Sequence, residues 1–471
     1  MAAVLVGTFM VALDQAIVTI ALPAVGHDLR ATSGIDWVVS GYLLALGVVQ
    51  PATGWLADRF GRKRVFLGSL ALFTVGSLLS GLAGDLPQLV LARIVQGVGG
   101  GAIFPVGMAM VYEQFPPSRR GMAMGIWSLG INVAPTLGPT LGGLIVGGLG
   151  WRWLFFVNVP IGLVAIVVAA RVLRLPGFQE KRPFDTVGFG LVTVGLAAIL
   201  LGVSEADAWG LTAAPTLTLL AFGAIMLIGF GVHELRHPDP LIDLRMFAIP
   251  AFSISMALVA GMIAVTLARL VFLPLELVTL RGMSEIEVGL ILTPAALTNA
   301  VAAPLAGILS DRIGARPPVV LGLIAMAVAS FMLANLGLDT PAFAIAAIVA
   351  LQGFGNGLAL TPNNVAGMNA LPQRMLARGT AIRSTTRQVA GSISTALLAA
   401  FLVARIGDLG RPGDPASAGA AQAAYNGVFF LCALISLGCI ALAFAFSVGA
   451  DEMQENAAAR TLEHERLVTK E

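Results

Sequence analysis

Long apolar segments separated by short polar connections follow one another along almost the whole chain. A helix that crosses a membrane needs about 20 mainly apolar residues. By that criterion we expect fourteen spans, centred near residues 13, 46, 75, 100, 134, 163, 194, 224, 262, 298, 327, 352, 392 and 436. The pattern therefore predicts an all-α membrane protein whose helices pack as a bundle.

The composition agrees with this interpretation. Of the 471 residues, 57% are hydrophobic and 11% are charged, whereas about a quarter of the residues of a soluble domain are charged. The chain is therefore not a soluble protein. We expect the lipid bilayer as a partner, and no nucleic acid.

The positions of the basic residues predict how the spans are oriented. Loops rich in Lys and Arg stay on the cytoplasmic side of a membrane. With the spans given above, most of the 28 Lys and Arg residues fall on one side. The exceptions are Arg93, Arg269 and Arg387 inside spans, and Arg30, Arg152, Arg281, Arg405 and Arg411 in the opposite connections. We therefore expect both termini in the cytoplasm.

The connection between the second and third spans is strongly cationic and reads Gly54-Trp55-Leu56-Ala57-Asp58-Arg59-Phe60-Gly61-Arg62-Lys63-Arg64. This pattern resembles the signature loop of the major facilitator superfamily of transporters. The resemblance implies a cytoplasmic gate at Gly54, Asp58, Arg59, Gly61 and Arg62. The alternative is that these charges only fix the orientation of the spans.

A weaker copy of the loop lies after the tenth span, as Gly307-Ile308-Leu309-Ser310-Asp311-Arg312-Ile313-Gly314-Ala315-Arg316. Two copies indicate duplicated halves. We place an N-terminal six-helix bundle at residues 1–174 and a C-terminal six-helix bundle at residues 250–448. Two additional membrane helices fall in the linker at residues 175–249, and residues 449–471 form a cytoplasmic tail.

A carboxylate interrupts the first span. Asp14 lies about 15 Å deep, in the middle of a hydrocarbon core about 30 Å thick. Charged groups at that depth are costly and usually functional, and burial favours the neutral form of a carboxyl group, so Asp14 is a candidate proton carrier. The alternative is that Asp14 is the structural partner of a buried arginine.

The stretch around this carboxylate carries a second resemblance. Leu13-Asp14-Gln15-Ala16-Ile17-Val18-Thr19-Ile20-Ala21-Leu22-Pro23 is similar to the first-span motif of the fourteen-span drug:proton antiporters, the EmrB/QacA group. Gln15 and Thr19 replace commoner residues of that motif. Two other stretches resemble the same group, namely Trp151-Arg152-Trp153-Leu154-Phe155-Phe156-Val157-Asn158-Val159-Pro160 and Arg387-Gln388-Val389-Ala390-Gly391-Ser392.

The fourth span contains Arg93-Ile94-Val95-Gln96-Gly97, which resembles the family's Arg-x-x-Gln-Gly motif. The resemblance implies a role of Arg93 in proton coupling. Because a guanidinium keeps its charge, it would act by stabilising the charged form of a neighbouring carboxyl such as Asp14. The alternative is that the long side chain of Arg93 extends to the outer interface.

The fifth span is rich in small residues and includes Gly125, Ala134, Gly138, Pro139, Gly142 and Gly143. Its Gly-Pro-x-x-Gly-Gly end resembles the antiporter motif of exporters. Glycine allows close helix contact and proline removes a backbone hydrogen bond, so the resemblance implies a helix that can bend. The alternative is ordinary packing of a glycine-rich membrane helix.

Charged residues in later spans are candidates for a central cavity. Arg269 and Glu276 lie two helical turns apart on one face of the ninth span, and Arg387 and Gln388 lie in the thirteenth. These four residues are expected to line the cavity. Alternatively, Glu276 lies near the outer interface beside Arg281.

No catalytic motif or metal-ligand spacing stands out, so we expect no enzyme activity, no resident metal and no cofactor. The four histidines lie in or near polar connections and are expected to be solvated: His27, His233, His237 and His464. Cys432 and Cys439, seven residues apart, are about 10 Å apart along a helix, too far for a disulfide, and are expected to be packing residues.

The resemblance implies a proton-coupled exporter of hydrophobic or cationic drugs that works by alternating access in the bacterial inner membrane. The proton gradient would supply the energy, and a monomer would suffice. A dedicated exporter of one endogenous metabolite or lipid is the alternative. A membrane enzyme is disfavoured because no nucleophile elbow or phosphate-binding loop is present. An uptake symporter is disfavoured by the fifth-span motif.

Overall fold

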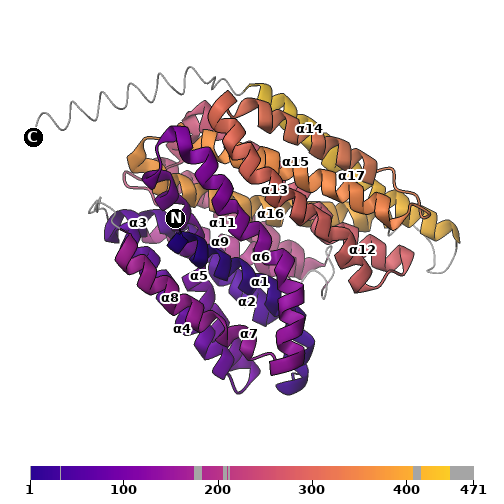
Figure 1. The fold of residues 1–471 in the computed structure, drawn as a ribbon, viewed down its shortest axis with the longest axis horizontal. Helices are drawn as coiled ribbons and strands as arrows, with labels where there is room; N and C mark the ends of the chain where they lie inside the picture. Colours follow the sequence, from indigo (N-terminus) through magenta and orange to yellow (C-terminus); the bar gives the residue numbers. More distant parts are fainter. Residues whose placement is uncertain are drawn as a thin grey trace, which may run out of the picture. The chain divides into compact units, whose positions relative to one another are not determined.

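The computed structural model describes residues 2–31, 33–173, 183–204, 209, 213–406 and 415–445, which form helices joined by short connections (Figure 1). Among these residues there is no β-strand. The predicted tail at residues 449–471 lies outside the described part of the chain.

The helices of the first part of the chain are α1 (Ala2–Asp28), α2 (Trp37–Val49), α3 (Thr53–Phe60), α4 (Arg62–Leu82), α5 (Leu86–Gln114), α6 (Arg120–Leu149), α7 (Trp153–Phe156), α8 (Asn158–Val172), α9 (Thr186–Ser204) and α11 (Ala214–Arg236). Those of the second part are α12 (Pro250–Arg281), α13 (Glu285–Ile313), α14 (Arg316–Leu333), α15 (Ala342–Asn369), α16 (Leu376–Ile406) and α17 (Pro415–Phe444). Short 3-10 turns lie at Gln50–Ala52, Pro117–Arg119, Leu244–Ala248 and Gln373–Met375.

Every one of the fourteen expected span centres lies within one of these helices. By length and hydropathy, 11 helical segments of the described residues can cross a membrane, or 12 if the bent helix α1 counts as one span. Helix α9 is apolar over the shorter segment Thr186–Gly202. The prediction of an all-α membrane protein is therefore confirmed, and the count of fourteen spans stays a prediction.

Helix α1 bends by 63° between Ala3–Thr19 and Ala21–Asp28. Pro23 lies inside the second segment. A proline in a helix has no N–H to donate, and its ring clashes with the carbonyl four residues earlier, which here is that of Thr19. The position of the bend therefore follows from this proline, and Asp14 remains in the longer segment.

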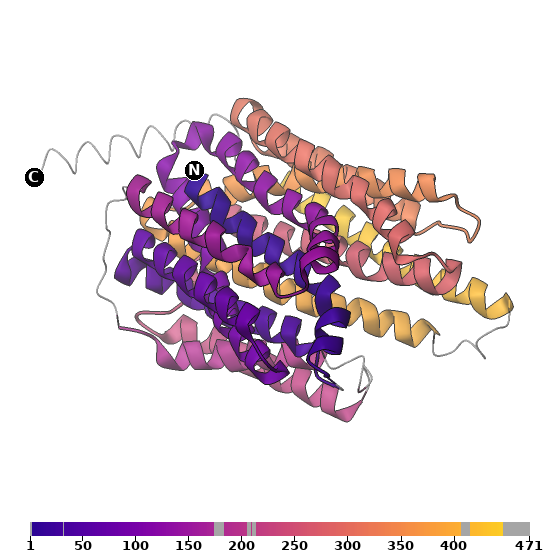
Figure 2. The same cartoon turned by 60° about the horizontal axis from the view of Figure 1, so that its bottom comes forward.

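The helices group into two compact units. The first contains α1 to α5 as far as Val111, residues Gly130–Met246, and α16. Within it α4 packs on α8, α9 packs on α11, and α16 packs on α3 (Figures 1 and 2). Helix α16, which the sequence places in the C-terminal bundle, is thus a neighbour of helices from the N-terminal half.

The second unit contains residues Tyr112–Leu129, which include the start of α6, together with α12 to α15 and α17. Helix α15 packs against α13 and α14, and α17 packs against α14 and α12. The boundaries predicted at residues 174, 249 and 448 remain predictions, since each unit combines helices from both halves of the sequence.

Glycine residues, which have no side chain, let α5 lie close to α2 and α4 at the same level. A Cβ atom built on Gly97 of α5 would lie 2.5 Å from the carbonyl oxygen of Tyr42 in α2. One built on Gly76 of α4 would lie 2.5 Å from the backbone nitrogen of Gln96. Small residues are common where membrane helices pack this closely. Glycine at these positions therefore brings the backbones of α2, α4 and α5 together.

Replacing Gly97 with alanine should consequently push α2 away from α5. We expect the Gly97→Ala protein to be less stable by about 1–3 kcal/mol, the usual cost of overpacking. The readout is the midpoint of thermal unfolding in detergent. Gly68→Ala is the matched control, because a Cβ at Gly68 of α4 would meet nothing within 4 Å. Equal midpoints for the two variants would contradict the close approach.

Candidate functional site

Asp14 and Arg93 form an ion pair in the interior of the first unit. Nη1 of Arg93, from α5, donates a hydrogen bond of 2.7 Å to Oδ2 of Asp14, from α1. The side chains are 1% and 0% exposed, respectively. The arginine therefore does not extend to an interface, and the two charges compensate each other where solvent is absent.

Two amide side chains complete the hydrogen bonding of the carboxylate. Nε2 of Gln96 donates to Oδ1 of Asp14 at 2.9 Å, and Nδ2 of Asn158, at the start of α8, donates to the same oxygen at 3.0 Å. Asn158 also donates to Oγ of Ser77 in α4 at 3.2 Å. Asp14 thus accepts three hydrogen bonds, from Arg93, Gln96 and Asn158.

The guanidinium of Arg93 has further partners besides Asp14. Its Nε donates to the carbonyl oxygen of Val38 at 3.0 Å, and Nη1 also donates to Oε1 of Gln96 at 2.7 Å. The ring of Tyr42 lies 4.0 Å from the guanidinium carbon, within the range of a cation–π contact. Helices α1, α2, α4, α5 and α8 therefore meet at one buried polar cluster.

The local sequence explains how α5 supplies this cluster. Arg93 and Gln96 are three residues apart and so share one face of the helix. Gly97 follows them and permits the close contact with α2 described above. The Arg-x-x-Gln-Gly motif thus supplies two polar side chains to the cluster, and its glycine leaves space for the backbone of α2 at the same level.

Sequence reasoning selected Asp14 and Arg93, which the structure brings together, but it did not select Asn158, Ser77 or Tyr42. Asn158 lay within the stretch Trp151–Pro160, so a signal for it was present. Ser77 and Tyr42 carried no signal, because serine and tyrosine are unremarkable in apolar helices. The Asp14–Arg93 contact alone agrees with both interpretations of Asp14, as a proton carrier and as the structural partner of a buried arginine.

The predicted gate residues lie at the junction of α3 and α4. Nε of Arg378 in α16 donates to Oδ2 of Asp58 at 2.8 Å, with the two side chains 10% and 13% exposed. A Cβ on Gly54 would lie 3.1 Å from Cα of Arg378, so α3 and α16 are in close contact. Gly61, with φ of 84°, makes the turn between α3 and α4. Arg59 is exposed and Arg62 is buried.

The second copy of the loop makes an equivalent contact within the second unit. Asp311 of α13 accepts hydrogen bonds of 2.9 Å from the backbone N–H groups of Gly121 and Met122 at the start of α6. Gly307 touches the same turn, and Gly314 has φ of 85°. The two helix starts share the pattern Arg-Gly-x-Ala, at residues 120–123 and 378–381. The duplicated loops therefore contact duplicated partners.

The residues of the fifth-span motif have unequal surroundings. A Cβ on Gly125 would lie 2.6 Å from Cα of Pro304, and one on Gly138 would lie 2.5 Å from Cβ of Ala16. Ala134 and Gly142 are buried, whereas Gly143 is exposed and has open space beside it. The side chain of Pro139 lies outside what the structure describes. Gly125 and Gly138 thus serve close helix contacts, and the bending role of the motif stays a prediction.

The four candidate cavity residues do not form one group. Glu276 of α12 is 0% exposed; its Oε1 accepts a hydrogen bond of 2.8 Å from Gln422 of α17 and lies 3.5 Å from Nη2 of Arg281. Arg269 is half-buried, and the described residues show no hydrogen bond or ion pair for it. In the first unit Arg387 is exposed, and Gln388 approaches Gly47 of α2. The contact between Glu276 and Arg281 agrees with the alternative given from the sequence.

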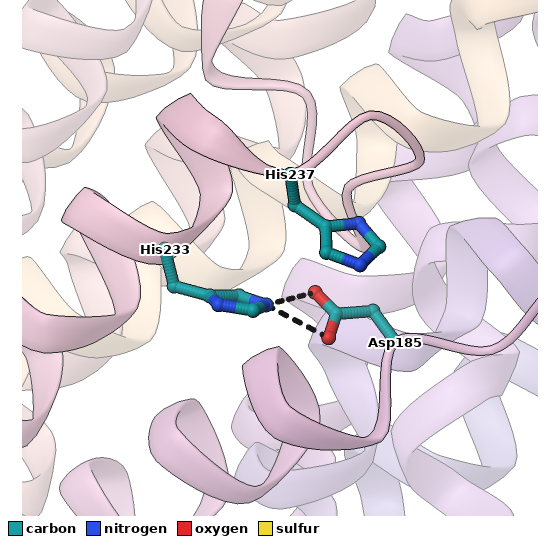
Figure 3. Close-up of side chains that lie close together, drawn as sticks. All are labelled: Asp185, His233 and His237. Carbon is teal, nitrogen blue, oxygen red and sulfur yellow. Dashed lines mark hydrogen bonds and ion pairs between the residues drawn. The ribbon is translucent and has the colours of Figure 1, made fainter.

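Two of the histidines are not simply solvated. Figure 3 shows His233 and His237, at the end of α11, on either side of the carboxylate of Asp185, which precedes α9. Nε2 of His233 lies 3.0 Å from each carboxylate oxygen. The expectation of a solvated side chain is therefore wrong for His233, because the antiparallel packing of α9 and α11 brings an acidic partner to it, while His237 is half-buried beside them.

The Asp58–Arg378 contact should contribute to stability. In a double-mutant cycle of Asp58→Asn and Arg378→Ala, we expect a coupling free energy of about 0.5–3 kcal/mol, as for residues in direct contact. Thermal unfolding in detergent supplies the four stabilities. The control cycle pairs Asp58→Asn with Arg64→Ala, because Arg64 is exposed. Additive effects in the first cycle would argue against the ion pair.

We expect Glu276 to contribute to the stability of the folded protein. Glu276→Gln removes the negative charge beside Arg281, whose side chain is 5% exposed, and should cost about 1–3 kcal/mol. Thermal unfolding should show the loss, and any change in transport should be the same for cationic and neutral compounds. Asp36→Asn, at an exposed carboxylate, is the control. A selective loss of cationic export without a change in stability would instead place Glu276 in the transport path.

Comparison with known proteins identifies the family. A sequence profile of the Major Facilitator Superfamily matches residues 4–275 and 269–469. The chain is 34% identical over 410 residues to the tetracenomycin C resistance and export protein of Streptomyces glaucescens, covering 86% of this chain and 76% of that protein. It is 34% identical over 406 residues to a multidrug resistance protein B homologue of Mycobacterium tuberculosis, covering 83% and 74% of the two chains.

Among solved structures, the chain resembles a crystal structure of a double tryptophan mutant of XylE. The TM-score is 0.68 at 15% sequence identity, and 97% of each chain is covered. At this identity the likeness concerns the fold alone, and the helices have the major facilitator fold. On the matched residues and the identity to these relatives, the chain belongs to the Major Facilitator Superfamily and is a multi-pass membrane transporter.

Proposed function

We propose that this transporter is a proton-coupled exporter of hydrophobic or cationic small molecules, antibiotics among them. It would work by alternating access in a bacterial inner membrane, with both termini in the cytoplasm. The observation that carries the proposal is the buried contact between Asp14 and Arg93. A titratable carboxyl at membrane depth, in direct contact with a permanent charge, is the group through which a proton could alter helix packing.

The coupling follows from charge balance. When a proton neutralises Asp14, Arg93 loses its counter-ion but keeps its charge in a dry interior, which is unfavourable. Its remaining acceptors are the Gln96 side chain and the Val38 carbonyl. A rearrangement that gives the guanidinium a new partner or water is then favoured. Conversely, reforming the ion pair expels the proton, so proton binding and helix rearrangement are linked.

The energy available from protons is sufficient for export. One charge that moves through 100 mV gains about 2.3 kcal/mol. Since about 1.4 kcal/mol corresponds to a tenfold ratio, one proton supports a concentration ratio of roughly fifty. No other energy source and no resident cofactor is required by this scheme.

The loop contacts are proposed to control access from the cytoplasm. Asp58 with Arg378, and Asp311 with the start of α6, each join a helix of one sequence half to a helix of the other. Such contacts must break and reform if the halves rearrange during a transport cycle. We therefore assign the loops a gating role, in which Gly54 and Gly307 allow the contacting helices to approach each other closely.

The names of the relatives support the substrate class. Two relatives are named for resistance to tetracenomycin C and for multidrug resistance. We propose membership of the fourteen-span drug:proton antiporters on the motifs given above, in particular those around Asp14 and Arg93. The Streptomyces relative, named for a single compound, favours a second candidate: a dedicated exporter of one endogenous compound. Transport measured over a panel of compounds separates the two.

Asp14→Asn should abolish transport driven by a pH gradient, because an amide cannot exchange a proton. The measurement uses the purified protein in liposomes, with a hydrophobic cationic dye such as ethidium and an imposed pH gradient. Exchange of dye across the membrane at equal concentrations, without a gradient, should persist in the variant. That persistence serves as the folding control.

Arg93→Lys tests the partner of Asp14. Lysine keeps the charge but cannot contact Asp14, Gln96 and the Val38 carbonyl at once, so we expect only partial pH-driven transport. If Asp14→Asn retains normal pH-driven transport, Asp14 is the structural partner of Arg93 and not the proton site.

A further inference from the structure

The only group of three or more metal-ligating side chains in the described part of the chain lies far in sequence from Asp14. It comprises Asp185, His233 and His237, and one possible ligand atom of each lies within 4.8 Å of the others (Figure 3). Helices α9 and α11 are antiparallel, so Asp185 at the start of α9 meets the two histidines at the end of α11. The group belongs to the first unit.

We propose that Asp185, His233 and His237 bind a divalent transition-metal ion of the Zn²⁺ class. Imidazole nitrogen and carboxylate oxygen are ligands that Zn²⁺ accepts at about 2.0–2.2 Å, with tetrahedral geometry. Ligand atoms in such a site are therefore about 3.3 Å apart. The distance from Nε2 of His233 to the carboxylate of Asp185 is 3.0 Å, already close to that value. A ring nitrogen of His237 lies within 4.8 Å of the other two ligand atoms.

A buried second carboxylate points independently to a cation. Glu234 of α11 is 1% exposed, and its Oε1 finds no N–H or O–H donor among the described residues. Its other oxygen accepts a hydrogen bond of 3.0 Å from the backbone of Ile242. A Cβ on Gly188 would touch the carboxylate oxygens of both Asp185 and Glu234, so these two groups face the same small space. A metal ion in this space would contact carboxyl oxygens of Asp185, with Glu234 beside the ligands.

Metal binding would also affect the segment that lies next to the Asp58–Arg378 contact. Nδ1 of His237 accepts a hydrogen bond of 3.2 Å from the backbone N–H of Asp239. Coordination by Nδ1 uses this lone pair, and coordination by Nε2 places a hydrogen on Nδ1, so either mode breaks the bond. Asp239 and Pro240 line one small pocket with Asp58 and Arg378. The ion would therefore reposition the segment after α11, which adjoins the Asp58–Arg378 contact.

The residue before the metal ligand makes a second connection to the gate. Phe184 packs on Trp55 of α3, with ring centroids 4.7 Å apart. Trp55 belongs to the cationic loop, three residues before Asp58. The site is thus joined to the loop on both sides, through Phe184 and through the segment after His237. Its role would be regulatory or stabilising, separate from proton coupling at Asp14.

The experiment measures metal binding by the purified full-length protein in detergent, without a polyhistidine tag and after treatment with a chelator. Zn²⁺ is titrated in competition with a chromophoric chelator, and Co²⁺ is added separately because its visible absorption reports coordination by nitrogen and oxygen. We expect one saturable equivalent per chain. The double variant His233→Ala/His237→Ala should bind at least about 100-fold more weakly, since losing even outer-shell partners costs 10–100-fold.

Three further variants test the roles of individual residues in Zn²⁺ binding. Asp185→Asn keeps the hydrogen-bonding shape but removes the charge, so it should lose Zn²⁺ affinity while remaining folded without metal. Glu234→Gln should weaken binding less. His27→Ala, at an exposed histidine on α1, should bind like the unmodified protein. Zn²⁺ should raise the thermal midpoint of the unmodified protein but not that of the double variant, because only bound ligand stabilises the folded state.

The proposal is overturned if the unmodified protein shows no saturable binding of Zn²⁺ or Co²⁺. It is equally overturned if Asp185→Asn and the double variant bind as the unmodified protein does, because the ion is then bound elsewhere. In either case the cluster is a metal-free hydrogen-bonded network. None of these measurements depends on transport, so they are independent of the function proposed above.

Discussion

The burial of one arginine constrains the whole first unit. A guanidinium cannot lose its charge, and in a solvent-free interior that charge has to be balanced and all of its donors satisfied. Asp14 supplies the balance, and Gln96 and the Val38 carbonyl accept further hydrogen bonds from Nη1 and Nε. These partners come from α1, α2 and α5, and Asn158 of α8 closes the cluster. Helix positions that differed by one turn would leave a charge unpaired, so the polar cluster determines the register of the surrounding helices.

The sequence predicted the elements well because membrane helices are marked by composition and length. Each expected centre lies in a helix, and the polar loops fall between them. The turn glycines were also recognisable, since Gly61 and Gly314 occur at the same place in two copies of one motif. The choice of Asp14 as a functional candidate followed from the cost of charge in hydrocarbon, and that of Arg93 from the resemblance of its stretch to a family motif.

Contacts between distant residues could not be predicted in the same way. Asp14 and Asn158 are 144 residues apart, and nothing in either segment states which helices are neighbours. The same holds for Asp58 with Arg378, and for Glu276, for which the sequence left a cavity or the neighbourhood of Arg281 open and which the structure buries against Gln422. His233 and Asp185 meet only because α9 and α11 are antiparallel neighbours. The position of α16 beside α3 was likewise invisible in the order of the spans.

The two copies of the loop differ in how they could change over evolutionary time. Asp58 accepts a hydrogen bond from the side chain of Arg378, so a single codon change at position 378 can remove this donor. Asp311 binds backbone N–H groups, which every residue except proline possesses, and no ordinary substitution at position 122 abolishes the donor. The first contact is therefore sensitive to substitution of the aspartate and of the donor side chain, whereas the second is sensitive mainly to substitution of the aspartate and of the glycines that allow the close approach. Duplication of one motif has thus produced two contacts of the same motif aspartate, one made to a donor side chain that evolution can exchange and one made to backbone donors.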